Sequence, residues 1–425
     1  MMTTLLDGPA VPGSLRQMNR LTVLRLLRQM GPTTKPALAK HTGISRPTIS
    51  KVIDDLEIDG LAERVGLAQP AANGGKPGAL YRFNAGGVRS GAVFLRVDIA
   101  QVAIIDGNAR VLAHIDQPLG DDRRPEPVLA LISATMKELM LHLGVTSDDL
   151  LGVGVGVPGL TSYHTGVVHF APHLPEWRDV ALCDLLAKEL GTAVWVDNDC
   201  HVQALAERHF GIGQDGMEFI SVQSGIGLSA AFYLDGTLYR GASDTAGEVG
   251  HMTVHEHGRR CDCGNTGCWE TIASTTALVE ATCATKNDTL ALPDWLQMPT
   301  LAVRTWGTIR ELDPATVTAV SHAIFAAAAN GQPEAITQVR DHARHFAVGI
   351  ANLINILNPQ RIIIWGDSVL GGQPFLDVVR AEVRRRALRG PSQNCEIVFT
   401  QLDQDVGLVG TGSLAIDALF GGVSQ

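Results

Sequence analysis

The sequence lacks the long apolar segments of a membrane protein, because no apolar run approaches the roughly 20 residues that a membrane-spanning helix needs. Residues 1–13 also lack a basic segment followed by a long apolar core, so we expect no secretory signal and a cytoplasmic protein. Charged residues are few, at 18%, and hydrophobic residues reach 45%, which argues against a disordered chain and allows sizeable cores. The 425 residues predict two or three domains.

Cysteine is also scarce, with seven residues in the whole chain. The number is odd, and three of the seven lie between Cys261 and Cys268. This spacing indicates a metal site in a reducing compartment rather than a disulfide framework.

Negative charge is scarce at one end of the chain. Residues 14–85 hold 11 Lys/Arg and 5 Asp/Glu, a net charge of +6, whereas the rest of the chain holds 23 against 39, a net charge of −16. A basic module before an acidic body indicates that the module alone contacts nucleic acid. A chance distribution of charge is the alternative.

Helix and turn signals follow one another in this basic module. The pattern predicts helices over residues 15–30, 36–42 and 45–59, then strands over 61–65 and 79–83 joined by a long glycine-containing loop. Gly43 marks the turn between the second and third helices, and Ser45 can cap the third. This succession of helices and a hairpin is a winged helix-turn-helix.

The third helix is the predicted DNA-reading element, because the N-terminal residues of one helix can reach base edges in a major groove. Its outward side chains offer a guanidinium, an ammonium and two hydroxyls, and a lysine at the tip of the wing can enter a minor groove. The predicted DNA contacts are Arg46, Thr48, Ser50, Lys51 and Lys76. A polar face that is merely solvated is the alternative.

Four carboxylates follow the first two turns of this helix: Asp54, Asp55, Glu57 and Asp59. Carboxylates repel phosphate, so we expect only the first two turns to lie in the groove.

The rest of the chain has an α/β pattern that partly restarts midway. Strands are predicted over residues 93–99, 102–105, 111–115, 150–157, 193–196, 217–223, 227–234, 237–239, 361–365 and 396–400. Helices are predicted over 127–143, 180–190, 200–210, 275–283, 316–329, 333–357, 375–388 and 412–419. Two similar α/β halves indicate a small-molecule site at their boundary.

The expected domain organisation follows from these patterns. A flexible tail covers residues 1–14, the winged helix-turn-helix covers 15–85, and the first α/β lobe covers 86–210, with 409–425 returning to it. The second α/β lobe covers 211–408 and contains the metal site.

One histidine and three cysteines form the predicted metal site: His251, Cys261, Cys263 and Cys268. One imidazole and three thiolates are a usual ligand set for tetrahedral zinc, and four protein ligands make a closed, structural site. Gly264 and Gly267 allow the chain to curl back to the metal. Buried free thiols are the alternative, and His255 and His257 are competing ligands.

The sequence resembles the ROK proteins, a family of repressors, open reading frames and sugar kinases. Residues 247–251 and 261–270 are similar to that family's GExGH and CxCGxxGCxE motifs. Further matches are residues 157–159, 198–199 and 238–242, and the winged helix resembles the repressor branch of the family. The resemblance implies an α/β fold of two lobes, actin-like (RNase H-like) and related to ATPases, behind the winged helix.

The resemblance also implies a sugar bound between the lobes. The matching positions are Asn198, Asp199, Glu248, His251, Glu270 and Gly159. Carboxylates and an amide can hydrogen-bond vicinal hydroxyls, and one ring nitrogen of His251 can bind zinc while the other donates to the sugar. A helix cap or a surface charge is the alternative for each acidic residue alone.

Three segments depart from the pattern of the family's kinases. Residues 98–102 lack both glycines of a DxGGT phosphate turn, residues 223–227 depart from GTGIG, and residues 365–368 lack a run of glycines. Asp199 matches the general base of the kinases, but we expect no kinase activity. Residues 154–159 also match GxGxxG, yet Pro158 interrupts them and no helix follows, so we expect no dinucleotide site.

The sequence therefore predicts a sugar-responsive transcription regulator that contains zinc, binds a double-stranded DNA operator as a homodimer or homotetramer, and has no membrane partner. Two alternatives stay open. One is a sugar kinase that also binds DNA, and the other is a regulator that a partner protein controls without a small-molecule ligand.

Overall fold

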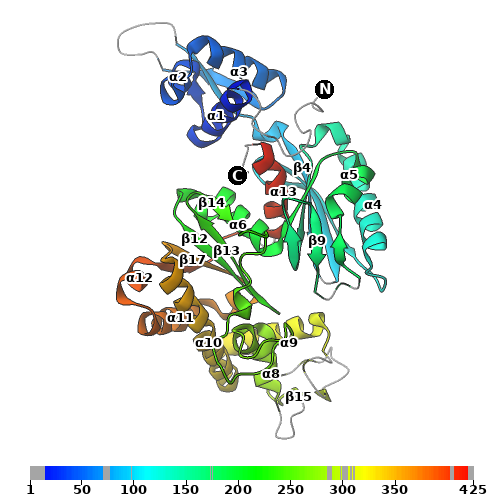
Figure 1. The fold of residues 1–425 in the computed structure, drawn as a ribbon, viewed down its shortest axis with the longest axis vertical. Helices are drawn as coiled ribbons and strands as arrows, with labels where there is room; N and C mark the ends of the chain where they lie inside the picture. The colour runs from blue at the N-terminus through cyan, green and yellow to red at the C-terminus, as the bar shows by residue number, and fades with distance from the viewer. Residues whose placement is uncertain are drawn as a thin grey trace. The chain divides into compact units, whose positions relative to one another are not determined.

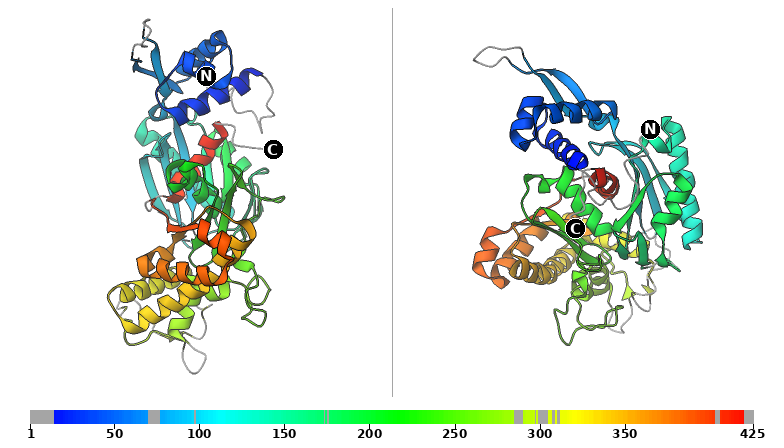
Figure 2. Two further views of the ribbon diagram at one scale, coloured as in Figure 1. Left: turned by 90° about the vertical axis from the view of Figure 1, so that its left-hand side faces the viewer. Right: turned by 45° about the horizontal axis from the view of Figure 1, so that its top comes forward.

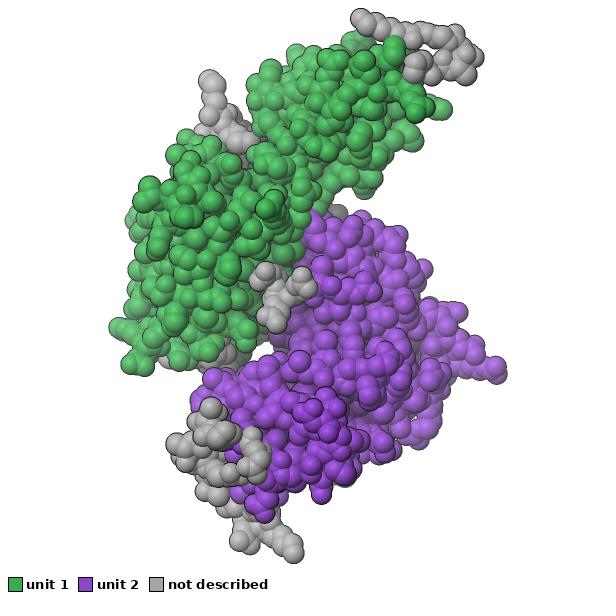
Figure 3. Space-filling view, turned by 180° about the vertical axis from the view of Figure 1, so that it is seen from behind, with its two compact units in different colours: residues 1–202, 404–425 green, residues 203–403 purple. Residues whose placement is uncertain are grey.

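The computed structural model of the chain describes residues 15–69, 77–96, 98–172, 174, 176–284, 290–296, 298, 305–306, 309, 312–402 and 406–419. The chain divides into two compact units, residues 1–202 with 404–425, and residues 203–403 (Figure 3). No helix in the described ranges is both long enough and apolar enough to span a bilayer. The predicted domain boundaries stay predictions.

The first part of unit 1 is a winged helix-turn-helix (Figure 1). Its elements are α1 (Leu15–Met30), β1 (Thr33–Thr34), α2 (Lys35–Thr42), α3 (Arg46–Ile58), β2 (Ala62–Leu67) and β3 (Ala79–Phe83). The strands form an antiparallel sheet in the order β1-β3-β2, and the β2–β3 hairpin extends away from the helices (Figure 2). The predicted helices and hairpin are confirmed, and only the two-residue strand β1 was missed.

Local signals in the sequence explain where these helices begin and end. The Thr34 side chain accepts a hydrogen bond from the Ala37 N–H at the start of α2. Gly43 has a φ of 70° and ends α2, since a left-handed conformation favours glycine. Ser45 caps α3 by accepting from the Thr48 N–H. The inward faces of the helices are fully apolar, with Leu24, Leu27, Leu38, Ile49, Ile53 and Leu56 all buried.

The rest of unit 1 is a five-stranded sheet in the order β11-β7-β4-β5-β6. The strands are β4 (Arg89–Leu95), β5 (Ile99–Asp106), β6 (Val111–Pro118), β7 (Val153–Val157) and β11 (Val194–Asn198), and the helices are α4 (Pro125–Leu143), α5 (Leu182–Leu190) and α13 (Val406–Leu419). The three consecutive strands are confirmed. The predicted strand over 93–99 was wrong at its end, because the chain turns after Leu95 and the Arg96 N–H donates to the Ile99 carbonyl (2.9 Å).

The side chains of this sheet alternate between two covered faces, as the two-residue period of a strand requires. Val93, Val102 and Val155 belong to the apolar cluster that includes α4 and α5. Ala92 and Ala103 face the other way and pack with Leu408 of α13. Helices therefore cover both faces of the sheet.

A second, small sheet in unit 1 was missed by the sequence analysis. It consists of β8 (Leu160–Ser162), β9 (Val167–Phe170) and β10 (Arg178–Val180), in the order β10-β9-β8. These strands are only three or four residues long, too short for an alternating pattern to be recognised.

Unit 2 contains the other five-stranded sheet, in the order β14-β13-β12-β17-β18. Its strands are β12 (Phe219–Ser224), β13 (Leu228–Leu234), β14 (Thr237–Tyr239), β17 (Arg361–Gly366) and β18 (Glu396–Phe399), and β15 (Leu290–Ala291) pairs with β16 (Thr305–Trp306). The helices of this unit are α7 (Glu270–Ala273), α8 (Thr275–Cys283), α9 (Pro314–Ala329), α10 (Pro333–Leu357), α11 (Gly372–Arg386) and α12 (Arg389–Asn394). Trp269, Phe325, Phe346 and Phe375 are buried in its core.

Helix α6 (Asp199–Phe210) begins in unit 1 and ends in unit 2. Near its end, buried Glu207 accepts hydrogen bonds from the Ile212 N–H (3.1 Å) and from the Thr400 hydroxyl. Burial raises the pKa of Glu207 above the usual range of a carboxyl group. The end of α6 is thus fastened to the segment that follows β18.

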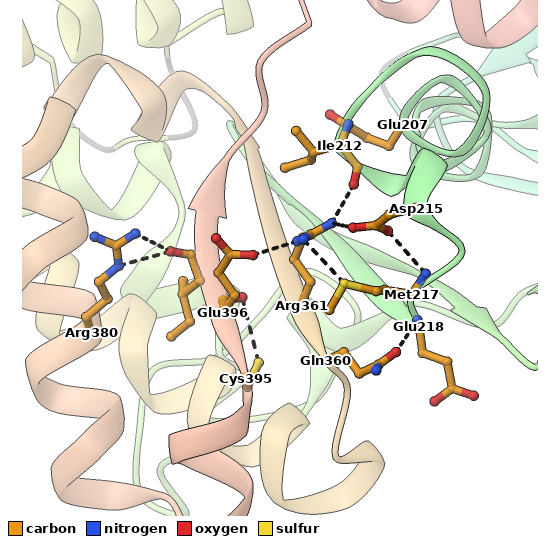
Figure 4. A network of polar contacts seen from close by, with 11 residues as sticks. Glu207, Ile212, Asp215, Met217, Glu218, Gln360, Arg361, Arg380, Cys395 and Glu396 are labelled. Carbon is orange, nitrogen blue, oxygen red and sulfur yellow. Dashed lines mark hydrogen bonds and ion pairs between the residues drawn. The ribbon is translucent and has the colours of Figure 1, made fainter.

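Arg361, the first residue of β17, holds three parts of unit 2 together (Figure 4). Its guanidinium donates to Asp215 (2.9 Å), to Glu396 of β18 (2.9 Å) and to the Ile212 carbonyl. The side chain is only 12% exposed, whereas both carboxylates remain partly solvated.

Replacing Arg361 with Met is expected to lower the free energy of unfolding by about 1–2 kcal/mol, because the Ile212 carbonyl and two carboxylates lose their donor. Urea unfolding of the full chain measures this change. Arg384→Met is the matched control, since Arg384 is exposed, and it should stay within about 0.5 kcal/mol of the parent protein. Equal stability of the two variants would contradict the assigned role.

Candidate functional site

The structure brings the four predicted metal ligands together in unit 2. The ligand atoms of His251, Cys261, Cys263 and Cys268 all lie within 4.8 Å of one another. The Cys263 and Cys268 sulfurs are 3.7 Å apart, and the Cys261 sulfur is 3.6 Å from His251 Nδ1. A tetrahedral ion with Zn–S bonds of about 2.3 Å would place its sulfurs about 3.8 Å apart. The cluster can therefore hold a metal ion, and both its donor set and its spacing fit zinc.

The loop that carries these ligands depends on one glycine. Gly267 has a φ of 74°, and a Cβ there would lie 1.7 Å from the His255 carbonyl oxygen. The Gly267 carbonyl accepts from the Val254 N–H (2.8 Å), and its N–H donates to the Arg259 carbonyl (2.8 Å). Only glycine allows this approach of the two halves of the loop, which brings Cys268 back beside His251.

The thiols of the cluster have unequal surroundings. Burial raises the pKa of Cys261 to about 12 and also raises the pKa of Cys268, whereas the Asn265 backbone N–H lowers the pKa of Cys263. The Asn265 side chain donates to the Cys268 sulfur (3.3 Å) and to the Thr253 hydroxyl (2.9 Å). A bound cation deprotonates such thiols, and Asn265 then supplies a donor to one thiolate.

The two ring nitrogens of His251 face different groups. Nδ1 faces the Cys261 sulfur, and Nε2 lies 3.9 Å from Glu248 Oε2. His251 and Glu248 belong to one tight turn, in which the His251 N–H donates to the Glu248 carbonyl (3.2 Å). Their side chains are 37% and 41% exposed, so both can be reached by a solute. One ring nitrogen thus faces the cysteine cluster and the other faces an exposed carboxylate, while the assignment of the two nitrogens to zinc and to a sugar stays a prediction.

Glu270 lies between the metal loop and the turn that joins β12 to β13. Its Oε2 accepts from the Leu228 N–H (3.1 Å), and its Oε1 is 4.0 Å from the Cys261 sulfur. Trp269, the residue before it, is fully buried and donates its indole N–H to the His345 carbonyl of α10 (3.1 Å). The position of Glu270 is therefore set by the core of unit 2.

The other predicted sugar-binding residues lie in unit 1, at the end of β11. The Asn198 side chain donates to the Gly159 carbonyl (2.8 Å) and accepts from the Cys200 N–H (2.8 Å). Asp199, at the first position of α6, also accepts from the Cys200 N–H (3.0 Å). Asn198 thereby ties the Gly159 loop to the start of α6, and all three predicted residues come together.

The sequence analysis missed a buried pair beneath these residues. Asp197 and His201 are both almost completely buried, and Asp197 Oδ1 lies 2.7 Å from His201 Nδ1. The same oxygen accepts from the Asn198 N–H (2.9 Å), so the pair orients the residues above it. Asp197 lies near the end of β11 and His201 in the first turn of α6, so their contact depends on the strand-to-helix junction and no helical spacing in the sequence indicates it.

The predicted DNA-contact residues lie on α3. Arg46 and Lys51 are exposed, and no carboxylate of the described residues pairs with either of them. Thr48 and Ser50 are half-buried, and their hydroxyls contact Ser45 Oγ (2.8 Å) and Lys35 Nζ (3.2 Å) respectively. Lys76 lies outside the described residues.

The segment that matches the first phosphate turn of a kinase is a plain strand here. Ala100 is fully buried in β5, and the Gln101 side chain donates to Asp116 of β6 (3.2 Å). The two positions that the sequence analysis compared with the glycines of a DxGGT turn thus hold the buried methyl group of Ala100 and the hydrogen-bonded side-chain amide of Gln101.

Side chains also join the two later segments that match kinase nucleotide loops. The buried hydroxyls of Ser224 and Ser368 are 2.6 Å apart, and His342 Nε2 is 3.2 Å from Ser368 Oγ. Asp367 Oδ2 lies 3.9 Å from where a Cβ on Gly225 would be, and His322 Nε2 is 3.1 Å from Asp367 Oδ1. The Asp367 carboxylate therefore lies beside the turn that joins β12 to β13.

A winged helix-turn-helix in front of an α/β body with two five-stranded sheets and a His/Cys cluster defines a regulator-like architecture. The ROK family model matches residues 95–418, and the MarR family model matches residues 17–67. The chain belongs to the ROK family, with an actin-like α/β body and a MarR-like winged helix.

Similar proteins include regulators and a kinase. The xylose repressor of Caldicellulosiruptor bescii is 27% identical over 408 residues, which are 96% of this chain and 97% of that protein. The crystal structure of a ROK family transcriptional regulator, described as a homolog of the E. coli MLC protein, has a TM-score of 0.78 and 25% identity and covers 96% of this chain and 97% of its own. A ROK family glucokinase from Streptomyces griseus, in complex with glucose and AMPPNP, has a TM-score of 0.63 and 26% identity and covers 77% of this chain and 99% of its own.

Proposed function

We propose that this protein is a sugar-responsive, DNA-binding transcription regulator that does not phosphorylate its sugar. The observation that carries the proposal is the winged helix-turn-helix joined to a ROK body, a combination that covers 96% of this chain in its match to a known regulator. The xylose repressor, named for a sugar, supports a sugar as the effector.

DNA binding is assigned to α3 and the hairpin. The exposed side chains of Arg46 and Lys51, which pair with no carboxylate of the described residues, are available for bases or phosphates, and Thr48 and Ser50 lie on the same helix. Lys76 is proposed as the contact of the wing. Paired heads in a homodimer or homotetramer would bind an inverted-repeat operator.

Sugar binding is assigned to one group of residues on each unit. Asn198, Asp199 and Gly159 form the group on unit 1, and Glu248, His251 and Glu270 form the group on unit 2. Carboxylates, an amide and an imidazole suit the donors and acceptors of vicinal hydroxyls. Zinc is the proposed metal, and it would hold His251 Nδ1 so that Nε2 stays directed at Glu248 and the sugar.

Loss of ATP binding is supported by three observations. Ala100 and Gln101 replace the first phosphate turn, side chains join the two later loops, and the Asp367 carboxylate lies beside Gly225. A carboxylate beside the turn at Gly225 would repel a phosphate group bound there. The similarity to the solved glucokinase supports a second candidate function, a sugar kinase that also binds DNA.

The test is the melting temperature of the zinc-loaded chain with free and phosphorylated sugars, including xylose and glucose, and with Mg-ATP. A ligand that binds the folded state at about 100 times its Kd adds about 2.7 kcal/mol of stability. We expect one sugar to raise the melting temperature and Mg-ATP to leave it unchanged. ADP production that depends on Asp199 would establish the kinase instead.

Glu248→Ala is expected to abolish the sugar-induced shift and leave DNA binding intact. Glu256→Ala, which removes an exposed acid from the same loop region, is the matched control and should respond normally. A normal response of Glu248→Ala would contradict the assigned sugar site. DNA binding without a shift from any sugar would favour control by a partner protein.

A further inference from the structure

Three of the four carboxylates at the C-terminal end of α3 are paired with cations from neighbouring elements. Two of the cations come from α1 and one from the start of α2. The pairs are Arg16–Asp55 (2.9 Å), Arg20–Asp59 (2.7 Å) and Lys35–Asp54 (2.6 Å). The sequence analysis expected these acids to keep the second half of the helix away from DNA, without any view of their partners.

Lys35 has the most contacts of the three cations. Its Nζ bonds Asp54 and also donates to Ser50 Oγ (3.2 Å), and it lies 5.1 Å from the centre of the Tyr81 ring. The Lys35 side chain is 24% exposed, so its stem is held between α2, α3 and β3. One ammonium therefore neutralises an acid of α3 and fixes a hydroxyl that is a predicted DNA contact.

We expect an ion pair such as Lys35–Asp54 to affect the affinity for DNA more than the free energy of unfolding. An exposed ion pair adds about 0–1 kcal/mol to folding. An unpaired carboxylate about 4 Å from a phosphate costs about 1 kcal/mol in water and about 4 kcal/mol near a protein surface. Cancelling that repulsion lets the helix approach the backbone that supplies most non-specific affinity.

We propose that Lys35 is a positioning residue of the DNA-binding surface. By neutralising Asp54 and holding Ser50, it allows α3 to approach phosphates beyond its first two turns. This inference rests on the proposed DNA-binding function and adds a residue that acts through α3 rather than on the bases.

The experiment measures binding of the full-length protein to a fluorescent duplex of random sequence, about 30 base pairs long, over a range of salt concentrations. Lys35→Met is expected to weaken binding at low salt about tenfold and to reduce the salt slope by about 1, the amount that one lost phosphate contact gives. A variant whose winged helix-turn-helix is merely destabilised would lose affinity for DNA without a change in the salt dependence of binding. Lys35→Arg keeps the pair and should bind within about twofold of the parent protein.

The double variant Lys35→Met with Asp54→Asn is expected to recover affinity and slope to within about threefold of the parent. Its matched control combines Lys35→Met with Glu57→Gln, which restores the same net charge at an exposed acid of α3 that pairs with no described cation. Equal recovery in both double variants, or none with Asp54→Asn, would overturn the inference. A parent protein that binds no duplex at any salt concentration would instead overturn the proposed function.

Discussion

Removal of the proposed zinc ion is expected to lower the melting temperature of the protein by about 10 °C. Binding of zinc to an isolated structural site is worth about 10–16 kcal/mol, and a part of that, about 3–5 kcal/mol, suffices for this shift at about 2–4 °C per kcal/mol. The reason is local: without the ion, buried Cys261 and Cys268 revert to thiols, and Gly267, Trp269 and Glu270 lose the anchor on one side of the loop. The measurement is a thermal unfolding curve before and after a strong zinc chelator, with the metal content determined by elemental analysis.

Cys268→Ser should reproduce the effect of chelation and remove the response to the chelator. Cys395→Ser is the matched control, because Cys395 is a half-buried cysteine of the same unit outside the cluster. We expect it to bind one metal ion per chain and to respond to the chelator like the parent protein. An unchanged melting temperature after complete metal removal would show that the cluster is not a structural site.

Gly154→Ala is expected to lower the free energy of unfolding by about 3–5 kcal/mol, at the severe end for a single methyl group. A Cβ on Gly154 of β7 would lie 1.7 Å from the Thr411 carbonyl oxygen of α13 and 3.2 Å from Leu414 Cβ. The obstacle is backbone rather than the end of a flexible side chain, so α13 must move away from the sheet. Urea unfolding of the full chain measures the loss.

Gly390→Ala is the control for this substitution, because a Cβ there meets nothing within 4 Å. Gly390 lies in α12 directly before Pro391, which removes the usual gain from alanine in a helix, so the variant should stay within about 0.5 kcal/mol of the parent protein. A Gly154→Ala variant as stable as the parent would mean that α13 does not pack on β7 as described.

These glycines also explain a motif that misleads. The GxGxxG pattern over residues 154–159 suits a dinucleotide loop, yet Gly154 and Gly156 lie within β7 and make room for α13, while Gly159 lies against the Phe170 carbonyl. A sequence pattern records that side chains are absent, but not whether a ligand or another part of the chain fills the space. Here Pro158 and the lack of a following helix were enough to reject the ligand.

The elements predicted best are those with long periodic patterns. The helices over residues 275–283 and 333–357 were predicted to the residue, because caps and an apolar face define both their ends and their buried side. The three strands β8, β9 and β10 were missed, since segments of three or four residues carry no period. The strand over 93–99 was extended too far because apolar and charged residues alternate through residue 99, as they do in a strand.

The metal site could be predicted because its ligands are close in the sequence and chemically distinctive. The pairing of Lys35 with Asp54 could not, since it joins residues 19 positions apart whose charges have many alternative partners. The same limit applies to Glu270, whose bond to the Leu228 N–H spans 42 positions and ties the metal loop to β13. The sequence indicates which kinds of side chain a site contains. Which of them form hydrogen bonds or ion pairs with distant residues follows only from the fold.

Helix α6 is a continuous helical connection between unit 1 and unit 2. The 12 residues of α6 span about 18 Å, and the first of them is the predicted sugar contact Asp199. Near the other end of the helix, Glu207 accepts a hydrogen bond from the Thr400 hydroxyl. Asp199 of unit 1 and Glu207 of unit 2 therefore lie on one continuous helix, so the chain passes from one unit to the other at residues 202–203 without a loop.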